Sequence, residues 1–398
     1  MDLALKDVRH HLGKFAATII GVGLLQGIVL TMNGIYRGTI MDGIWLIEHT
    51  QTDLWVVERG RGGPFNEQSR IPEQTYRAVS AVPGVEKASP FISYVVEREV
   101  AGKSRQFTII GYDVFGGLGG PESMVAGRGI ERAHYEMVVD AKLGLKPGDK
   151  VRLELHDYEV VGVVRGAVDS GGNPLVYVSW PDAQEILYQR DNEALRTERA
   201  AALRQLGAMG YTPTEAARVL PLVTGASVGT ISAVLVRLSP GMNPYAVAEH
   251  IRSGLFVNAY TTSEEKDLML KGRLIRMTQI LGLFRALLIV VSVVVIALLL
   301  YVLTMEKIKS IATLKLIGAQ NSLIVRLIFE QSLVITVASF FLGYALISAT
   351  HEKFPRTLVF ATSDTLLTFI VILVGGALAS LLGIVQALRT PPSLALGG

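Results

Sequence analysis

Four long runs of apolar residues constrain this chain more than any other feature of its sequence. None of the four contains Asp, Glu, Lys or Arg, and they span residues 15–36, 286–305, 333–350 and 366–388. About 20 apolar residues are enough for an α-helix to cross a bilayer, where only a helix or closed barrel satisfies its own backbone. Each run is therefore predicted to be a membrane-spanning helix. The alternative is four buried helices of a soluble protein.

The first run is predicted to be a retained anchor. It follows a short basic leader and is longer than the apolar core of a signal peptide, and no small-x-small cleavage site is evident. A helix of this kind also starts the translocation of the residues that follow it.

The segment between the first two spans has the pattern of a water-soluble α+β domain. Only 18% of the 398 residues are charged, which is a modest deficit, so a large water-facing part is expected beside the spans. Runs rich in β-branched and aromatic residues predict strands near 53–57, 94–100, 107–112 and 158–164. Helices are predicted at 72–82, 181–188 and 193–206, whereas 207–221 is not placed and 193–221 has no assigned role.

Basic residues in the short loops predict the orientation in the membrane. They gather in the leader, after the second span and after the last span, at Lys6, Arg9, Lys14, Lys307, Lys309, Lys315, Arg326 and Arg389. Both termini are thus expected in the cytoplasm, with the large domain on the periplasmic side of a bacterial inner membrane. A basic cluster at Lys271, Arg273, Arg276 and Arg285 argues for the reverse, but it ends a long translocated domain, where this rule is weak.

These observations predict four transmembrane α-helices with a large extracytoplasmic α+β domain inserted between helices 1 and 2. Thr262 and Glu265 fit a capping box that would open a stalk helix running unbroken into the second span. The expected parts are leader and first span (1–40), α+β domain (41–261), stalk and second span (262–305), cytoplasmic helix (306–321), third span (322–350), outer loop (351–364), and fourth span with tail (365–398).

The cytoplasmic helix is predicted from an apolar stripe at three- and four-residue steps, which contains Ile308, Ile311 and Ala312. Gly318 would end it as a helix C-cap. From the residues alone, a helix resting on anionic lipid and a helix docking on a partner remain equally open.

The run Glu306-Lys-x-Lys-x-Ile-Ala-x-Leu-Lys-x-x-Gly-Ala319 resembles the hallmark of the MacB/FtsX-like permeases, the mechanotransmission class of ABC transporters. Residues 3–9, 138–149 with 158–164, and 390–396 are similar to the leader, periplasmic core and closing motif of that family. The resemblance implies a coupling helix that docks on an ATPase through Glu306, Lys307, Lys309, Ile311, Ala312, Lys315, Gly318 and Ala319.

The resemblance also implies the assembly. It predicts a non-catalytic permease subunit, present as a homodimer with two copies of a separate ABC ATPase. ATP and Mg would bind only that ATPase, because this chain has no Gly-x-x-x-x-Gly-Lys-Ser/Thr loop. A periplasmic adaptor and an outer-membrane channel are further implied partners, and the function would be export or extraction of a substrate. The alternative is an FtsX-like signalling subunit that activates a cell-wall hydrolase.

Two further features each have two possible roles. Glu330 begins the third span, where it is either an interfacial carboxylate or a coupling residue. Gly23 and Gly27 form a small-xxx-small motif for close helix packing, within the chain or in a dimer. The absence of cysteine and the scattered histidines predict no metal site, and a net charge of +3 does not suggest nucleic-acid binding.

Overall fold

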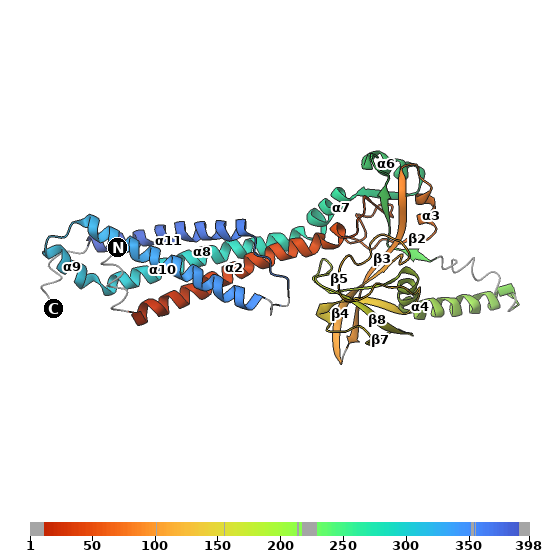
Figure 1. Cartoon of the computed structure of the whole chain (residues 1–398), viewed down its shortest axis with the longest axis horizontal. Coiled ribbons are helices and arrows are strands. Elements are labelled where there is room, and N and C mark those ends of the chain that lie inside the picture. Colours follow the sequence, from red (N-terminus) through yellow and green to blue (C-terminus); the bar gives the residue numbers. More distant parts are fainter. Residues whose placement is uncertain are drawn as a thin grey trace. The chain divides into compact units, whose positions relative to one another are not determined.

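The computed structural model describes residues 12–100, 102–154, 156–212, 215–216, 229–351, 354 and 356–389, without the side chains of Leu12 and 188–199. These residues form two compact units, drawn in Figure 1. The helical unit holds the chain up to Thr39 and from Arg276 onward, and the α/β domain holds Ile40–Ile275. The family-like segments at 3–9 and 390–396 lie outside the described residues.

The helical unit contains four helices long and apolar enough to cross a membrane. They are α2 (Leu12–Glu48), α8 (Ile275–Glu306), α10 (Asn321–Thr350) and α11 (Thr362–Arg389), and a short helix α9 (Ile308–Leu316) joins α8 to α10. The four predicted spans are thereby confirmed as helices. Each helix is longer than its apolar run, because the flanking polar residues continue the same backbone hydrogen bonds.

The α/β domain is built on one large twisted sheet whose strands lie in the order β12-β1-β11-β3-β4-β9-β6-β8-β5, with β7 paired to β8. The strands are β1 (Leu54–Glu58), β3 (Val85–Val100), β4 (Lys103–Tyr112), β5 (Met124–Gly127), β6 (Glu136–Asp140), β7 (Lys150–Leu153), β8 (His156–Val164), β9 (Leu175–Ser179), β11 (Ala233–Leu238) and β12 (Val257–Thr261). A separate pair joins β2 (Ile71–Pro72) to β10 (Thr230–Ile231). The four predicted strands are present, and β3 is longer than predicted.

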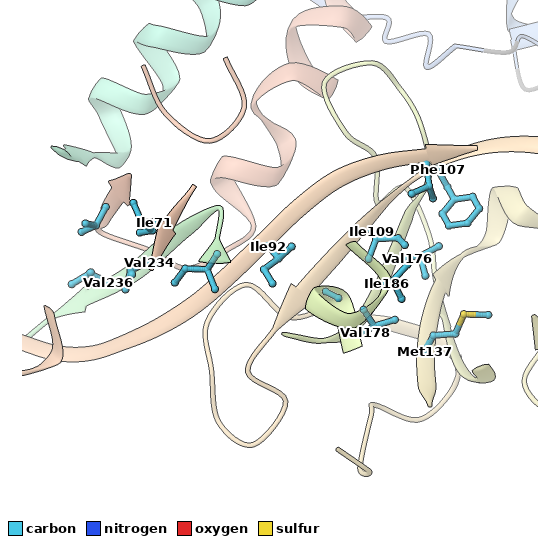
Figure 2. Packing of buried hydrophobic residues seen from close by; sticks show 14 of the residues in the cluster. Ile71, Ile92, Phe107, Ile109, Met137, Val176, Val178, Ile186, Val234 and Val236 are labelled. Atoms are coloured by element: carbon cyan, nitrogen blue, oxygen red, sulfur yellow. The ribbon is translucent and has the colours of Figure 1, made fainter. Parts of the chain in front are cut away.

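Both faces of the sheet are buried. Along β1, Leu54 and Val56 point into one apolar core while Trp55 and Val57 point into the other, as the two-residue period of a strand requires. The first core, shown in Figure 2, is covered by α3 (Thr75–Ser80), α4 (Trp180–Ala208) and α6 (Pro244–Gly254). The second core is covered by the end of α2 and by the chain following β12.

The helical predictions need three corrections. The helices predicted at 181–188 and 193–206 are one helix, α4, because nothing in 189–192 breaks the backbone pattern. The capping box lies one residue earlier than expected, with Thr261 as N-cap and Glu264 as its partner at the start of α7 (Thr262–Leu268). The stalk is not an unbroken α-helix, because a π-helical turn (Met269–Arg273) and the turn residue Leu274 separate α7 from α8.

The stalk segment 262–275 also belongs to the α/β domain by its packing rather than to the second span. Met269 and Leu274 are buried in the second core of that domain, which explains the assignment.

Candidate coupling site

The site suggested by the sequence lies in the helical unit, around α9. Helix α8 ends at Glu306, and Lys307 forms the joint to α9 with no side-chain cap. The backbone N–H of Lys307 donates to the carbonyl of Thr304 over 3.1 Å, and Ile311 then bonds back to Lys307 over 2.9 Å. The chain therefore turns within one residue, so α9 is a separate helix.

One face of α9 is packed inside the helical unit. Ala312 is fully buried and Ile311 is almost so. Ile311 belongs to a small core that also contains Ile324 and Ile328 of α10 and Ile384 and Ala387 of α11. The apolar stripe predicted from the sequence is therefore present, but it faces the chain's own helices.

Lys315 ties α9 to the end of α11. Its Nζ donates to the carbonyl oxygens of Ala387 and Leu388, both over 2.9 Å. The last carbonyls of a helix have no intrahelical donor and carry the negative end of its dipole, so a lysine is a favourable partner there. Lys315, predicted as a contact for a partner protein, connects α9 to α11 in this structure.

The start of α9 is tied to the start of α2. The Nζ of Lys14 lies 2.9 Å from a carboxylate oxygen of Glu306, and both side chains are largely exposed. The ammonium of Lys307 lies 5.0 Å from the ring centroid of the buried Phe15, in cation–π geometry. Contacts with three long helices, α2, α10 and α11, thus hold α9 and its N-cap residue in place.

Gly318 ends α9 as predicted. Its φ of +93° is left-handed, and its N–H donates to the carbonyl of Lys315 while that of Ala319 donates to Leu314. This pair of bonds is a Schellman motif, which favours glycine at the left-handed position. Gly318 and Ala319 therefore fix where α9 ends.

The opposite face of α9 is exposed. It presents Lys309, Ser310, Thr313, Leu316 and Ile317. Ile317 is 80% exposed, although isoleucine is among the residues most often buried. This set, called the outer face of α9 below, includes Lys309 of the predicted site, whereas its other four members were not predicted.

The remaining predicted residues have intramolecular contacts. Glu330 accepts a bond from Arg326 one turn earlier on α10, over 2.9 Å. Gly23 and Gly27 pack against α10 of the same chain, near Ser339 and Gly343, so the small-xxx-small motif serves helix packing within the chain.

Sequence reasoning missed a polar network in the helical unit. Arg285, taken above as a flanking charge, donates to Asn33 over 3.0 Å, and Asn33 donates to Thr368 over 3.3 Å. This network links α8, α2 and α11. The available signal was Asn33 itself, because an amide within an apolar run needs a partner.

The contacts at this site position a helix. Among the described residues, no three or more His, Asp or Glu side chains converge in a way that could hold a metal ion. The arrangement instead fixes a short exposed helix to three long ones.

Comparison with known proteins gives the family. A family model described as the MacB-like periplasmic core domain matches residues 15–253, and one described as the FtsX-like permease C-terminal matches residues 282–392. An uncharacterised ABC transporter permease of Mycobacterium tuberculosis (strain ATCC 25618 / H37Rv) is 22% identical over 395 residues, covering 99% of both chains. HrtB of Staphylococcus haemolyticus, named as a candidate hemin transport system permease, is 29% identical over 409 residues, covering 100% of this chain and 99% of the relative.

Solved structures are also similar to part of this chain. The periplasmic region of MacB from Actinobacillus actinomycetemcomitans aligns with a TM-score of 0.34 and 15% identity, over 57% of this chain and 96% of that one. The two family models together cover nearly the whole chain and fall in the expected order. The resemblance predicted from the sequence is confirmed, and the chain belongs to the MacB/FtsX-like family of ABC transporter permeases.

Proposed function

We propose that this permease is driven by a separate cytoplasmic ATPase that docks on the outer face of α9. ATP and Mg would bind that partner. The observation that carries the proposal is the contrast between the two faces of α9: one is fixed to three long helices, and the other is exposed.

The bracing of α9 explains how docking would act on the membrane part. The contacts of Lys315, Ile311 and Lys307 join α9 to α11, α10 and α2 respectively. Packed interfaces of this kind shift as blocks rather than deform continuously. A displacement of α9 by the ATPase would therefore move three helices together instead of bending one.

The working assembly would be a dimer of this chain with two ATPase copies, in the inner membrane, with the α/β domain in the periplasm. That domain would handle a substrate for export or for extraction from the outer leaflet. A periplasmic adaptor, and an outer-membrane channel, would complete the route in a Gram-negative cell.

The test is Ile317→Trp on the outer face of α9. If α9 only rests on lipid, tryptophan should strengthen its partitioning, because the ring favours the headgroup level. If α9 docks in a cleft of the ATPase, the larger ring overpacks the contact by about 1–3 kcal/mol, a loss of roughly five- to hundredfold in affinity. We expect normal membrane insertion and loss of the ATPase that co-purifies with the native permease.

Lys309→Arg keeps the charge and is the matched control, expected to retain the ATPase. Ala312 is unsuitable for this test, since its substitution would disturb the chain's own packing. Normal ATPase recovery by Ile317→Trp, or no ATPase with the native chain, would contradict docking at this face.

A further inference from the structure

The α/β domain contains a carboxylate that has no partner among the residues that the structure describes. Glu265, on α7, is fully buried, and neither of its oxygens has a hydrogen-bond partner. A buried polar group of this kind is rare, and an ionised carboxylate in such a position is strongly disfavoured. Its position therefore requires an explanation.

The loop 60–66 covers this carboxylate. Gly63 lies directly over it with a φ of +88°, and a Cβ at that position would overlap both carboxylate oxygens. Two hydrogen bonds, together called the clasp below, hold the loop. Tyr260 Oη donates to the carbonyl of Arg61 over 2.9 Å, and the N–H of Arg273 donates to Asn66 Oδ1 over 3.2 Å. The clasp thus joins the loop to β12 and to the π-helical turn.

Open space adjoins the clasp. A cleft of about 770 Å³ lies between the loop and the stalk. Its lining includes Gly62, Asn66, Glu67, Tyr260, Asp267 and Lys271. Lifting of the loop into this space would let water reach the carboxylate without moving the core.

The charged groups around Glu265 do not neutralise it. On the same helix, Glu264 is 3.4 Å from Arg252 of α6 and also caps α7, Lys266 pairs with Glu48, and Asp267 pairs with Lys271. On the loop, Arg61 pairs with Glu58 and Glu67. Tyr260 of β12 and Arg273 of the π-helical turn face the loop through the bonds given above. The cations within reach are therefore already engaged by other groups.

We propose that Glu265 is a proton-binding site that latches the loop 60–66 onto the stalk: the neutral acid keeps the loop closed, and ionisation releases it. The latch lies one turn before the π-helical segment, which leads directly into α8. Release of the loop removes the clasp on Arg273, and thereby frees that turn.

The pH range follows from the burial. Desolvation raises the pKa of Glu265 from 4.5 to about 8 in the closed loop. Once the loop opens, the carboxyl returns toward its ordinary pKa, so the closed state binds one proton more than the open state between these values. The closed state therefore loses stability as the pH rises, and opening increases tenfold per pH unit from about 4.5 to 8, then levels off.

The test is hydrogen–deuterium exchange on the full chain in lipid nanodiscs, with each rate divided by its intrinsic rate at that pH. Protection of the amides in 60–66, and of the Arg273 amide that donates to Asn66, should fall tenfold per pH unit up to about 8. Glu265→Gln keeps the shape of the neutral acid, so its protection should be high and independent of pH. Asp267→Asn, at an exposed carboxylate on the same helix, should keep the native slope.

Gly63→Ala provides a second, independent variant. Its methyl group cannot fit over the carboxylate, so the loop should stay unprotected at every pH. A flat profile for the native chain, the native slope in Glu265→Gln, or native protection in Gly63→Ala would each overturn the latch.

Discussion

Glu136 shows how one carboxylate can organise a loop of the α/β domain. It is 1% exposed and accepts bonds from Arg128 Nη2 over 2.7 Å and from the N–H groups of Glu131 and Arg132 over 2.9 and 3.0 Å. These donors, led by Arg128, lower the pKa of Glu136 from 4.5 to about 2 despite its burial. Glu136 and Glu265 thus have opposite shifts because only the first has donors.

The acid stability of the α/β domain should depend on Glu136. Its folded pKa lies below its unfolded pKa, so its stabilisation is complete above about 4.5 and is lost as the pH falls toward 2. Glu136→Gln should lower the free energy of unfolding by about 2 kcal/mol at neutral pH and flatten its decline between these values.

Urea unfolding followed by tryptophan fluorescence measures this effect, because Trp45, Trp55 and Trp180 all lie in the α/β domain. Glu131→Gln, at an exposed carboxylate 3.7 Å from the same Arg128, is the matched control. An unchanged acid profile in Glu136→Gln would show that the loop is held by other contacts.

At the scale of elements, α2 and α10 approach each other through glycines. A Cβ on Gly343 would lie 2.6 Å from the carbonyl oxygen of Gly23 and 2.9 Å from the nitrogen of Gly27. Both are backbone atoms, which cannot turn aside as a side chain can. Contact between helices at this distance is available only to glycine.

Gly343→Ala should therefore separate α2 from α10 and lower the free energy of unfolding by about 1–3 kcal/mol. Gly21→Ala is the matched control on α2, since a Cβ there meets nothing within 4 Å, and it should be neutral or slightly stabilising. Circular dichroism in increasing SDS compares the two variants. Equal stability of both would mean that the helices can separate freely.

An element could be predicted where neighbouring residues in the sequence determine it, and not where contacts with distant residues do. The four spans could be predicted because a long apolar run that crosses lipid must be helical. The end of α9 could be predicted from Gly318. The partners of Lys315 could not be predicted, because the carbonyls of Ala387 and Leu388 are over 70 residues away in the chain. The π-helical turn was also missed, since its helical pattern is interrupted only by Gly272, and the burial of its first residue, Met269, in the domain core is a tertiary contact that the local sequence does not show.

At the scale of the whole molecule, the orientation in the membrane follows from the distribution of Lys and Arg and stays a prediction. The chain has no cysteine, so single thiols can be introduced without background. Lys103→Cys, in the α/β domain, should react with a membrane-impermeant thiol reagent in intact spheroplasts. Asn321→Cys, at the start of α10, should react only after lysis, and reversed labelling would place both termini outside.

The small number of buried residues in α8 determines which substitutions this helix can accept during evolution. Helix α8 has four buried residues, one per turn, at Ser292, Ile296, Leu300 and Thr304, whereas nine residues of α11 are buried and three of them are glycines. At most positions of α8, the residue therefore only has to be apolar. Descendant sequences should exchange Val, Ile, Leu and Phe freely along α8, while α11 accumulates few accepted substitutions and preserves the record of common ancestry for longer.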